Sequence, residues 1–231
     1  MNLKTQLKSA LVATIPVMTG YLVLGFGFGV ILATKGYGIL WALGMSLFIY
    51  AGSMQFVAID LITGGAGIIT TALTTLMVNA RHLFYGISMV EKYKSAGAKK
   101  PYLIFALTDE TYSLLCAEQV TEENRRVFHT RSFLISLFDQ IWWVTGSVIG
   151  SMAGAHLPFS TEGIDFALTA LFVTVFVEQW LSTKRHLPAL IGVGVSALCL
   201  VIFGADVFLI PSMILITVSL MLMRGREAAD V

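Results

Sequence analysis

Long apolar runs separated by short polar connections make up almost the whole of this chain. Runs of about 18 or more apolar residues are typical of membrane-spanning helices, because the hydrocarbon core of a bilayer is about 30 Å thick. The runs lack the every-second-residue alternation of a membrane β-barrel strand. The pattern predicts an all-α integral membrane protein, a polytopic bundle of about six to eight segments. The predicted segments are 12–33, 38–63, 67–90, 102–118, 130–154, 164–182, 187–205 and 208–223.

Composition supports this class and narrows the function. Of 231 residues, 56% are hydrophobic and only 13% are charged, whereas soluble domains have about 25% charged residues. The net charge of +1 gives no sign of a nucleic-acid partner. The isolated Cys116 and Cys199 predict neither a disulfide nor a zinc site, and nucleotide-binding and metalloprotease motifs are missing, so we expect no cofactor or metal. Because no soluble stretch interrupts the pattern, we expect residues 1–231 to form one lipid-embedded domain.

Basic residues indicate which connections face the cytoplasm. The positive-inside rule predicts cytoplasmic N- and C-termini and an alternating order for the last four segments. The segments in the first half of the chain do not fit a simple alternation between the two sides of the membrane, because single crossings throughout would put Lys92–Lys100 outside. Either 38–63 and 102–118 are broken and re-enter, the first bending near Ala51–Ser53, or both span and the loop breaks the rule. We favour re-entry, since broken helices occur at membrane depth where they line a cavity.

The third segment carries a charge where the pattern places the bilayer. A charge at the bilayer centre costs about 2.5–3.5 kcal/mol. Asn79, His82 and Tyr85 have the spacing of one helix face. Arg81 has the planar fork that suits a carboxylate, and His82 can exchange a proton near neutral pH. These residues predict a site for a carboxylate-bearing solute. The alternative is that Arg81 extends toward the basic loop at Lys92 and His82 satisfies a helix contact.

Two adjacent carboxylates, Asp109 and Glu110, lie inside the short segment 102–118. Adjacent residues point apart on a helix, so we expect them to have different partners. Either carboxylate is a candidate to bind an amino group or to carry a proton. The alternative is that Asp109 caps a helix start, with Thr108 beside it. Both interpretations are compatible, because a helix start inside a membrane is itself a device for binding solutes.

The predicted bend in 38–63 also carries polar groups. Gly52 permits a tight bend, and Ser53 and Gln55 offer neutral hydrogen bonding at membrane depth; the alternative is a packing face of small residues. Ser53 and His82 are the one conceivable nucleophile and base of an intramembrane hydrolase. The residues flanking Ser53 do not form the glycine-flanked nucleophile motif, so we do not expect an enzyme.

Two further patterns concern packing. The spacings Gly25-xxx-Gly29 and Gly146-xxx-Gly150-xxx-Gly154 are typical of close helix contact. Asp139 precedes Trp142 and Trp143, and tryptophans gather at membrane interfaces, so we expect this stretch near an interface.

In order and spacing, these motifs resemble the AzlC family, the large subunits of branched-chain amino acid exporters. The likeness extends over essentially the whole chain, and its stretches are Tyr50–Phe56, Asn79–Gly86 and Thr108–Thr111, with residues 20–29 and 139–150. The resemblance implies a small membrane partner subunit of the AzlD type and export of hydrophobic amino acids.

Together the residues and the resemblance predict a secondary transporter of the bacterial inner membrane. It would export branched-chain amino acids by alternating access around a midplane site, driven by protons. The alternative is a passive channel or facilitator. The residues predicted to bind the substrate are Gly52, Ser53, Gln55, Asn79 and Arg81. Those predicted to handle the substrate ammonium or the proton are His82, Asp109 and Glu110.

Overall fold

The computed structural model describes residues 3–156, 173, 176–177, 180–181, 186–205 and 207–229. Within these residues the chain is helical and contains no β-strand. The chain falls into two compact units, residues 1–169 and 170–231, and each is described by itself. Most of the predicted segment 164–182 lies outside the described residues. The single domain expected over residues 1–231 stays a prediction.

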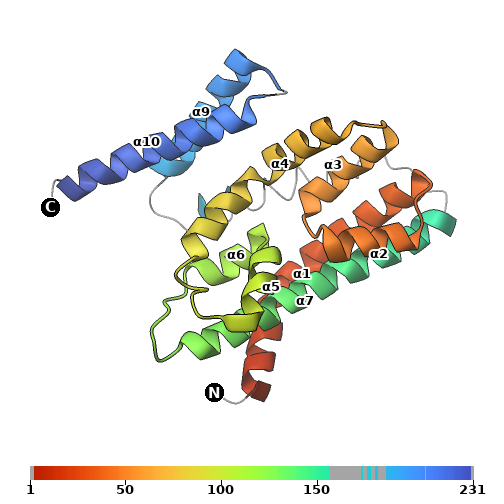
Figure 1. Cartoon of the computed structure of the whole chain (residues 1–231), viewed down its shortest axis with the longest axis horizontal. Helices are drawn as coiled ribbons and strands as arrows, with labels where there is room; N and C mark the ends of the chain where they lie inside the picture. The colour runs from red at the N-terminus through yellow and green to blue at the C-terminus, as the bar shows by residue number, and fades with distance from the viewer. Residues whose placement is uncertain are drawn as a thin grey trace. The chain divides into compact units, whose positions relative to one another are not determined.

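Helices α1 (Leu3–Thr34) and α7 (Arg125–His156) pack side by side in the first unit (Figure 1). Among the described helices, these two are long and apolar enough to cross a membrane. They run parallel, because Gly25 lies against Gly146 and Gly29 against Gly150. A Cβ on Gly29 would lie 2.1 Å from the Ser147 carbonyl oxygen. The glycine motifs therefore bring two backbones into direct contact, as predicted.

The segment predicted at 38–63 is two short helices, α2 (Ile39–Phe48) and α3 (Gly52–Thr63). With 10 and 12 residues, they are about 15 and 18 Å long, roughly half a bilayer each. Between them Tyr50 adopts a positive φ of 43°. Gln140, near the middle of α7, donates to the Leu47 carbonyl. The α2–α3 tip therefore lies at mid-height of α7, and the predicted break is confirmed.

The segment predicted at 102–118 is also broken. After α4 (Ile68–Met89) and the short η1 (Gly97–Lys99), the chain forms α5 (Lys100–Phe105) and α6 (Asp109–Cys116). Ala106–Thr108 forms the tip of this pair. Phe105, at the end of α5, lies beside the tip of the first pair, where the rings of Phe105 and Tyr50 are 6.1 Å apart. The Lys92 ammonium donates to carbonyls at the end of α6, so α6 returns to the end of the unit from which α5 left.

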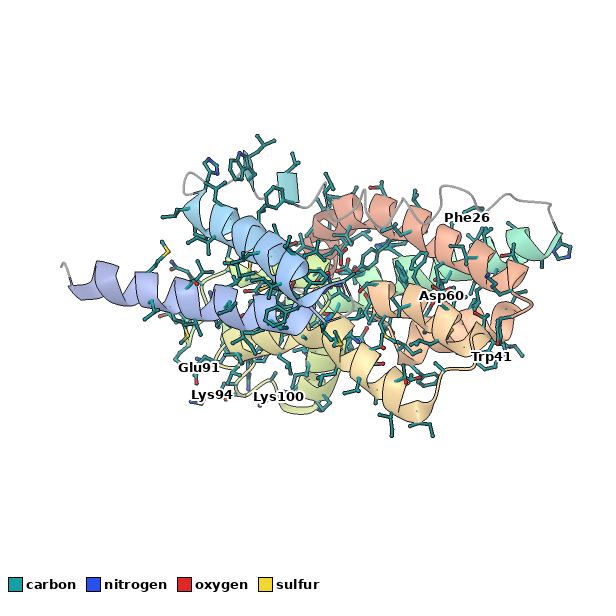
Figure 2. All side chains as sticks on the ribbon, turned by 90° about the horizontal axis from the view of Figure 1, so that it is seen from above. Phe26, Trp41, Asp60, Glu91, Lys94 and Lys100 are labelled. Carbon is teal, nitrogen blue, oxygen red and sulfur yellow. The ribbon has the colours of Figure 1, made fainter. Side chains whose placement is uncertain are left out.

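The basic segments of the first unit lie together. Arg125, at the start of α7, donates to the Glu91 carbonyl, and Lys99 donates to Thr130. One apolar cluster joins Ala10 of α1 to Met89, Tyr93 and Phe128. Figure 2 shows Glu91, Lys94 and Lys100 at one end of this unit and Trp41, Asp60 and Phe26 toward the other.

The end of the unit at which each helix begins and finishes decides between the two topologies left open by the sequence. Because α4 ends beside the start of α1, α2–α3 must enter and leave at the far end of the unit. The α5–α6 pair enters and leaves at the basic end. The structure therefore has the re-entrant arrangement, and Lys92–Lys100 lies with the N-terminal part of α1, as the positive-inside rule requires.

In the second unit, α9 (Leu187–Phe203) and α10 (Leu209–Ala229) pack against each other. Gly204 ends α9 with a φ of 76°, a conformation that favours glycine. Both helices match the predicted segments, and α10 continues six residues beyond the predicted end at 223.

Candidate functional site

Arg81, in the middle of α4, connects the two re-entrant pairs. Its Nη2 lies 3.0 Å from Asp109 Oδ2 and donates to Ser53 Oγ at 2.8 Å. Ser53 is in the first turn of α3, and Asp109 is the first residue of α6. Arg81 is thus held between the starts of two half-length helices that come from opposite ends of the unit. It does not extend toward Lys92, so that alternative is wrong.

The two helix starts around Arg81 are electropositive. The N–H groups in the first turn of a helix have no partner within the helix and carry a partial positive charge. The start of α3 at Gly52 has no side-chain cap. At the start of α6, Thr108 Oγ1 accepts from the Thr111 N–H. Thr108 is therefore the cap, not Asp109, and Asp109 is left to pair with Arg81.

Glu110 points away from Arg81, as expected for a residue adjacent to Asp109. The Tyr21 hydroxyl on α1 donates to Glu110 Oε2 at 2.7 Å and also lies 2.7 Å from Thr108 Oγ1. The two carboxylates predicted to act in coupling therefore have different partners, one on α4 and one on α1. Whether either handles a proton or an ammonium stays a prediction.

Gln55 and Gly52 face α7. Gln55 is fully buried, accepts from Trp143 Nε1 at 2.9 Å and donates to Ser46 Oγ at 3.2 Å. A Cβ on Gly52 would lie 3.1 Å from the Trp143 ring. These contacts fasten the α2–α3 tip to α7, whereas the neighbouring Ser53 contacts Arg81 on α4. Sequence reasoning predicted a role in substrate binding for both residues, and that role stays a prediction.

His82 and Asn79 interact within α4. His82 Nδ1 lies 3.3 Å from the Asn79 carbonyl oxygen, and its ring packs edge-on against Tyr85. His82 thus makes the helix contact that was its structural alternative. Asn79 lies two residues before Arg81 on another face of the helix, and its binding role stays a prediction. Ser53 Oγ is engaged by Arg81, so the described contacts do not form a Ser53–His82 hydrolase pair.

Asp139 and Trp143 lie near the middle of the 32-residue helix α7, far from both of its ends, so their predicted place at a membrane interface is wrong. Asp139 is 0% and Trp143 3% exposed, and both lie on the face of α7 that packs against the re-entrant pairs and α1. Asp139 Oδ2 accepts from Thr111 Oγ1 at 2.8 Å. Trp143 meets Tyr21 edge-on, with ring centroids 5.4 Å apart. The neighbouring tryptophan pair suggested an interface, whereas the small residues beside it allow this face to be buried.

Sequence reasoning also passed over the polar face of α7. A signal was available, because polar residues recur there at helical spacing and all are buried: Ser132, Ser136, Asp139, Gln140, Ser147 and Ser151. Tyr21 and Thr111 were missed for another reason. Neither residue is charged, and each becomes notable only through its partner. In the described part of the chain, no cluster of His, Cys, Asp or Glu side chains could hold a metal ion.

Comparison with known proteins agrees with this architecture. The family model described as AzlC protein matches residues 16–157. The chain belongs to the AzlC family. It is 40% identical to the branched-chain amino acid transport protein AzlC of Bacillus subtilis, over 100% of this chain and 92% of that protein.

Two other relatives extend the comparison. A Helicobacter pylori membrane protein is 40% identical, over 95% of each chain, and the inner membrane protein YgaZ of Escherichia coli is 29% identical, over 87% of this chain and 82% of that protein. No solved structure matches. Together with the helices, these matches identify an AzlC-type helical membrane protein and support a role in membrane transport.

Proposed function

We propose that this protein is the large subunit of a secondary transporter that exports branched-chain amino acids across the bacterial inner membrane. It works by alternating access and is coupled to protons, with both chain termini in the cytoplasm. The observation that carries the proposal is the position of Arg81, paired with Asp109 between the starts of α3 and α6. Broken helices that direct their starts toward a midplane site are a recurring device of transporters.

The Arg81–Asp109 pair is suited to a zwitterion. A free amino acid carries a carboxylate and an ammonium on one carbon. It can insert between the two side chains, giving its carboxylate to Arg81 and its ammonium to Asp109. One ion pair is then replaced by two, and the net charge of the site does not change. This matters because an uncompensated charge at this depth costs about 2.5–3.5 kcal/mol. The uncapped N–H groups at Gly52 and Ser53 can donate to the same carboxylate.

The partner in this proposal is a small membrane subunit of the AzlD type. Much of α4 is exposed in the isolated chain and strongly apolar, as at Ile69, Leu73, Leu76 and Leu83. Such a face suits either lipid or another membrane helix. The substrate class rests on the branched-chain amino acid transport named for the Bacillus subtilis relative and on the zwitterion-compatible pair.

The test is transport in liposomes that contain the chain and its small partner. We expect saturable movement of labelled leucine against its gradient when a pH step is imposed. Arg81→Ala lowers that flux about 10- to 100-fold, because a hydrogen bond to a charged group contributes about 1.5–3 kcal/mol. Arg81→Lys restores only part of it, since lysine keeps the charge and loses the fork. Asp60→Asn, at an exposed position of α3, is the matched control.

Three outcomes would overturn the proposal. If the wild-type protein does not increase leucine flux, leucine is not its substrate. If Arg81→Ala keeps full flux, Arg81 is not part of the substrate site. A flux linear in concentration identifies a passive facilitator. To separate loss of function from loss of fold, Arg81→Gln combined with Asp109→Asn removes both charges together. The double substitution leaves no uncompensated buried charge, so we expect a variant that elutes normally in size-exclusion chromatography but transports no leucine.

A further inference from the structure

A continuous line of hydrogen-bonding groups joins two carboxylates across the start of α6. The Tyr21 hydroxyl donates to Glu110 Oε2 at 2.7 Å and touches Thr108 Oγ1 at 2.7 Å. Thr108 Oγ1 donates to Thr111 Oγ1 at 3.1 Å. Thr111 Oγ1 in turn donates to Asp139 Oδ2 at 2.8 Å. Residues from α1, α6 and α7 thus form one line of hydrogen bonds, here called the hydroxyl chain: Glu110–Tyr21–Thr108–Thr111–Asp139.

The hydroxyl chain has one hydrogen too few for its hydrogen bonds. It has four contacts, whereas its three hydroxyl groups supply three hydrogens. Tyr21 gives its hydrogen to Glu110, and Thr108 gives its hydrogen to Thr111. No hydrogen then remains for the 2.7 Å contact between Tyr21 and Thr108. One added proton, on either carboxylate, completes all four contacts.

We propose that Glu110 and Asp139 share a single proton through the hydroxyls of Tyr21, Thr108 and Thr111. When Glu110 holds the proton, it donates to Tyr21, and the three hydroxyls point toward Asp139. When Asp139 holds it, the three hydroxyls point the other way. Reversing them transfers one proton between the two carboxylates, with no other change in bonding. The proton comes from solution, and no electron moves.

The surroundings of the chain favour such a shared proton. Asp139 and Thr111 are 0% exposed, and Tyr21 is 4% exposed. Asp139 Oδ1 is buried and makes no hydrogen bond within the described residues. Glu110 is half-buried. An ionised Asp139 so enclosed would lack compensation, and a proton shared with Glu110 lowers that cost.

Other titratable or charged groups face the two ends of the chain. Arg81, Asp109 and Tyr85, all on α4 or α6, face the Glu110 end. Tyr50, at the α2–α3 tip, faces Asp139, Tyr21 and Glu110. Tyr102, on α5, faces the Asp139 end. Arg81 and Asp109 neutralise each other. The surrounding groups therefore do not supply the compensating charge, and the proton does.

The transport role of the hydroxyl chain rests on the proposed function. In that function the hydroxyl chain holds the coupled proton, and the Arg81–Asp109 pair binds the amino acid. The direct test of the shared proton is pH-difference infrared spectroscopy of the full-length protein in liposomes, following the carbonyl stretch of a buried protonated carboxyl. An amide can donate the missing hydrogen. Glu110→Gln and Asp139→Asn therefore each complete the chain without a proton.

The shared proton makes a distinctive prediction. The wild-type protein shows one buried carboxyl proton, and either Glu110→Gln or Asp139→Asn alone abolishes it. Two independent carboxyls would instead lose their signals one at a time. Separate bands, each removed by one substitution, would overturn the proposal, as would the absence of any such band. Asp60→Asn leaves the spectrum unchanged.

The spectroscopic test needs no substrate, so its result is independent of the transport proposal. In liposomes, both amide variants are expected to lose leucine accumulation driven by a pH step. Normal leucine accumulation in either variant would show that the hydroxyl chain takes no part in proton coupling. If even the wild-type protein moves no leucine, the proposed function fails while the infrared result still decides whether the proton is shared. The melting temperatures of the amide variants verify that they fold.

Discussion

The contact between α1 and α7 makes a sharp prediction at Gly150. A Cβ added there would lie 2.0 Å from the Phe26 carbonyl oxygen and 2.7 Å from the Phe26 Cα. Both neighbours are backbone atoms, so neither can turn away as a side chain would. Ordinary contact begins near 3.4 Å, so Gly150→Ala forces the two helices apart by about 1.4 Å at this level.

Overpacking of this kind costs about 1–3 kcal/mol, and we expect the upper end because rigid backbone must move. At about 2–4 °C for each kcal/mol, the melting temperature falls by about 6–12 °C. The assay is thermal unfolding of the purified protein in detergent, followed by intrinsic tryptophan fluorescence. Gly44→Ala in α2 is the matched control, because nothing lies within 4 Å of its added Cβ. Equal melting of Gly150→Ala and Gly44→Ala would refute direct backbone contact.

Three further predictions concern the rest of the first unit. Gln55→Leu leaves the Trp143 indole N–H without its acceptor and lowers the free energy of unfolding by about 1–3 kcal/mol in detergent melts; an unchanged melt would contradict that contact. Ser95→Gly stabilises the exposed turn by about 0.5–1 kcal/mol, because Ser95 has a φ of 67°, and a loss of stability would contradict this backbone. Of two cysteines placed at Lys94 and Gly64 in intact cells, the first is expected to react from the cytoplasmic side and the second from the external side; the reverse assignment would contradict the re-entrant arrangement.

The breaks in both re-entrant pairs could be predicted because they interrupt apolar runs with residues that do not suit a continuous buried helix. Gly52 and Ser53 mark the first, and Thr108 and Asp109 mark the second. The direction of each pair was left open by these residues. It was decided only by contacts between distant segments, such as Arg125 with the Glu91 carbonyl, which no local pattern contains.

The candidate site was predicted in part for a related reason. Arg81 and Asp109 are charges in apolar sequence, and a charge at membrane depth requires a partner, so each indicated that the other existed. Asp139 was misplaced because two neighbouring tryptophans resemble an interface anchor. Its true position follows from the length of α7, which begins at Arg125 and puts Asp139 near its midpoint. Tyr21 and Thr111 could not be found from sequence, because a neutral hydroxyl is unremarkable until its partner is known.

The first turn of α6 takes part in both proposed sites. Asp109 faces Arg81, while Thr108, Glu110 and Thr111 belong to the hydroxyl chain. Adjacent residues on a helix point apart, so a single turn can serve two sites on opposite sides. A shift of α6 that lengthens the Arg81–Asp109 contact must also change the contacts to Tyr21 and Asp139. Coupling between two ligands requires an element whose position both of them bias, and this turn meets that requirement. By linkage, a proton that changes amino acid affinity through α6 has its own affinity changed by the same factor when the amino acid binds.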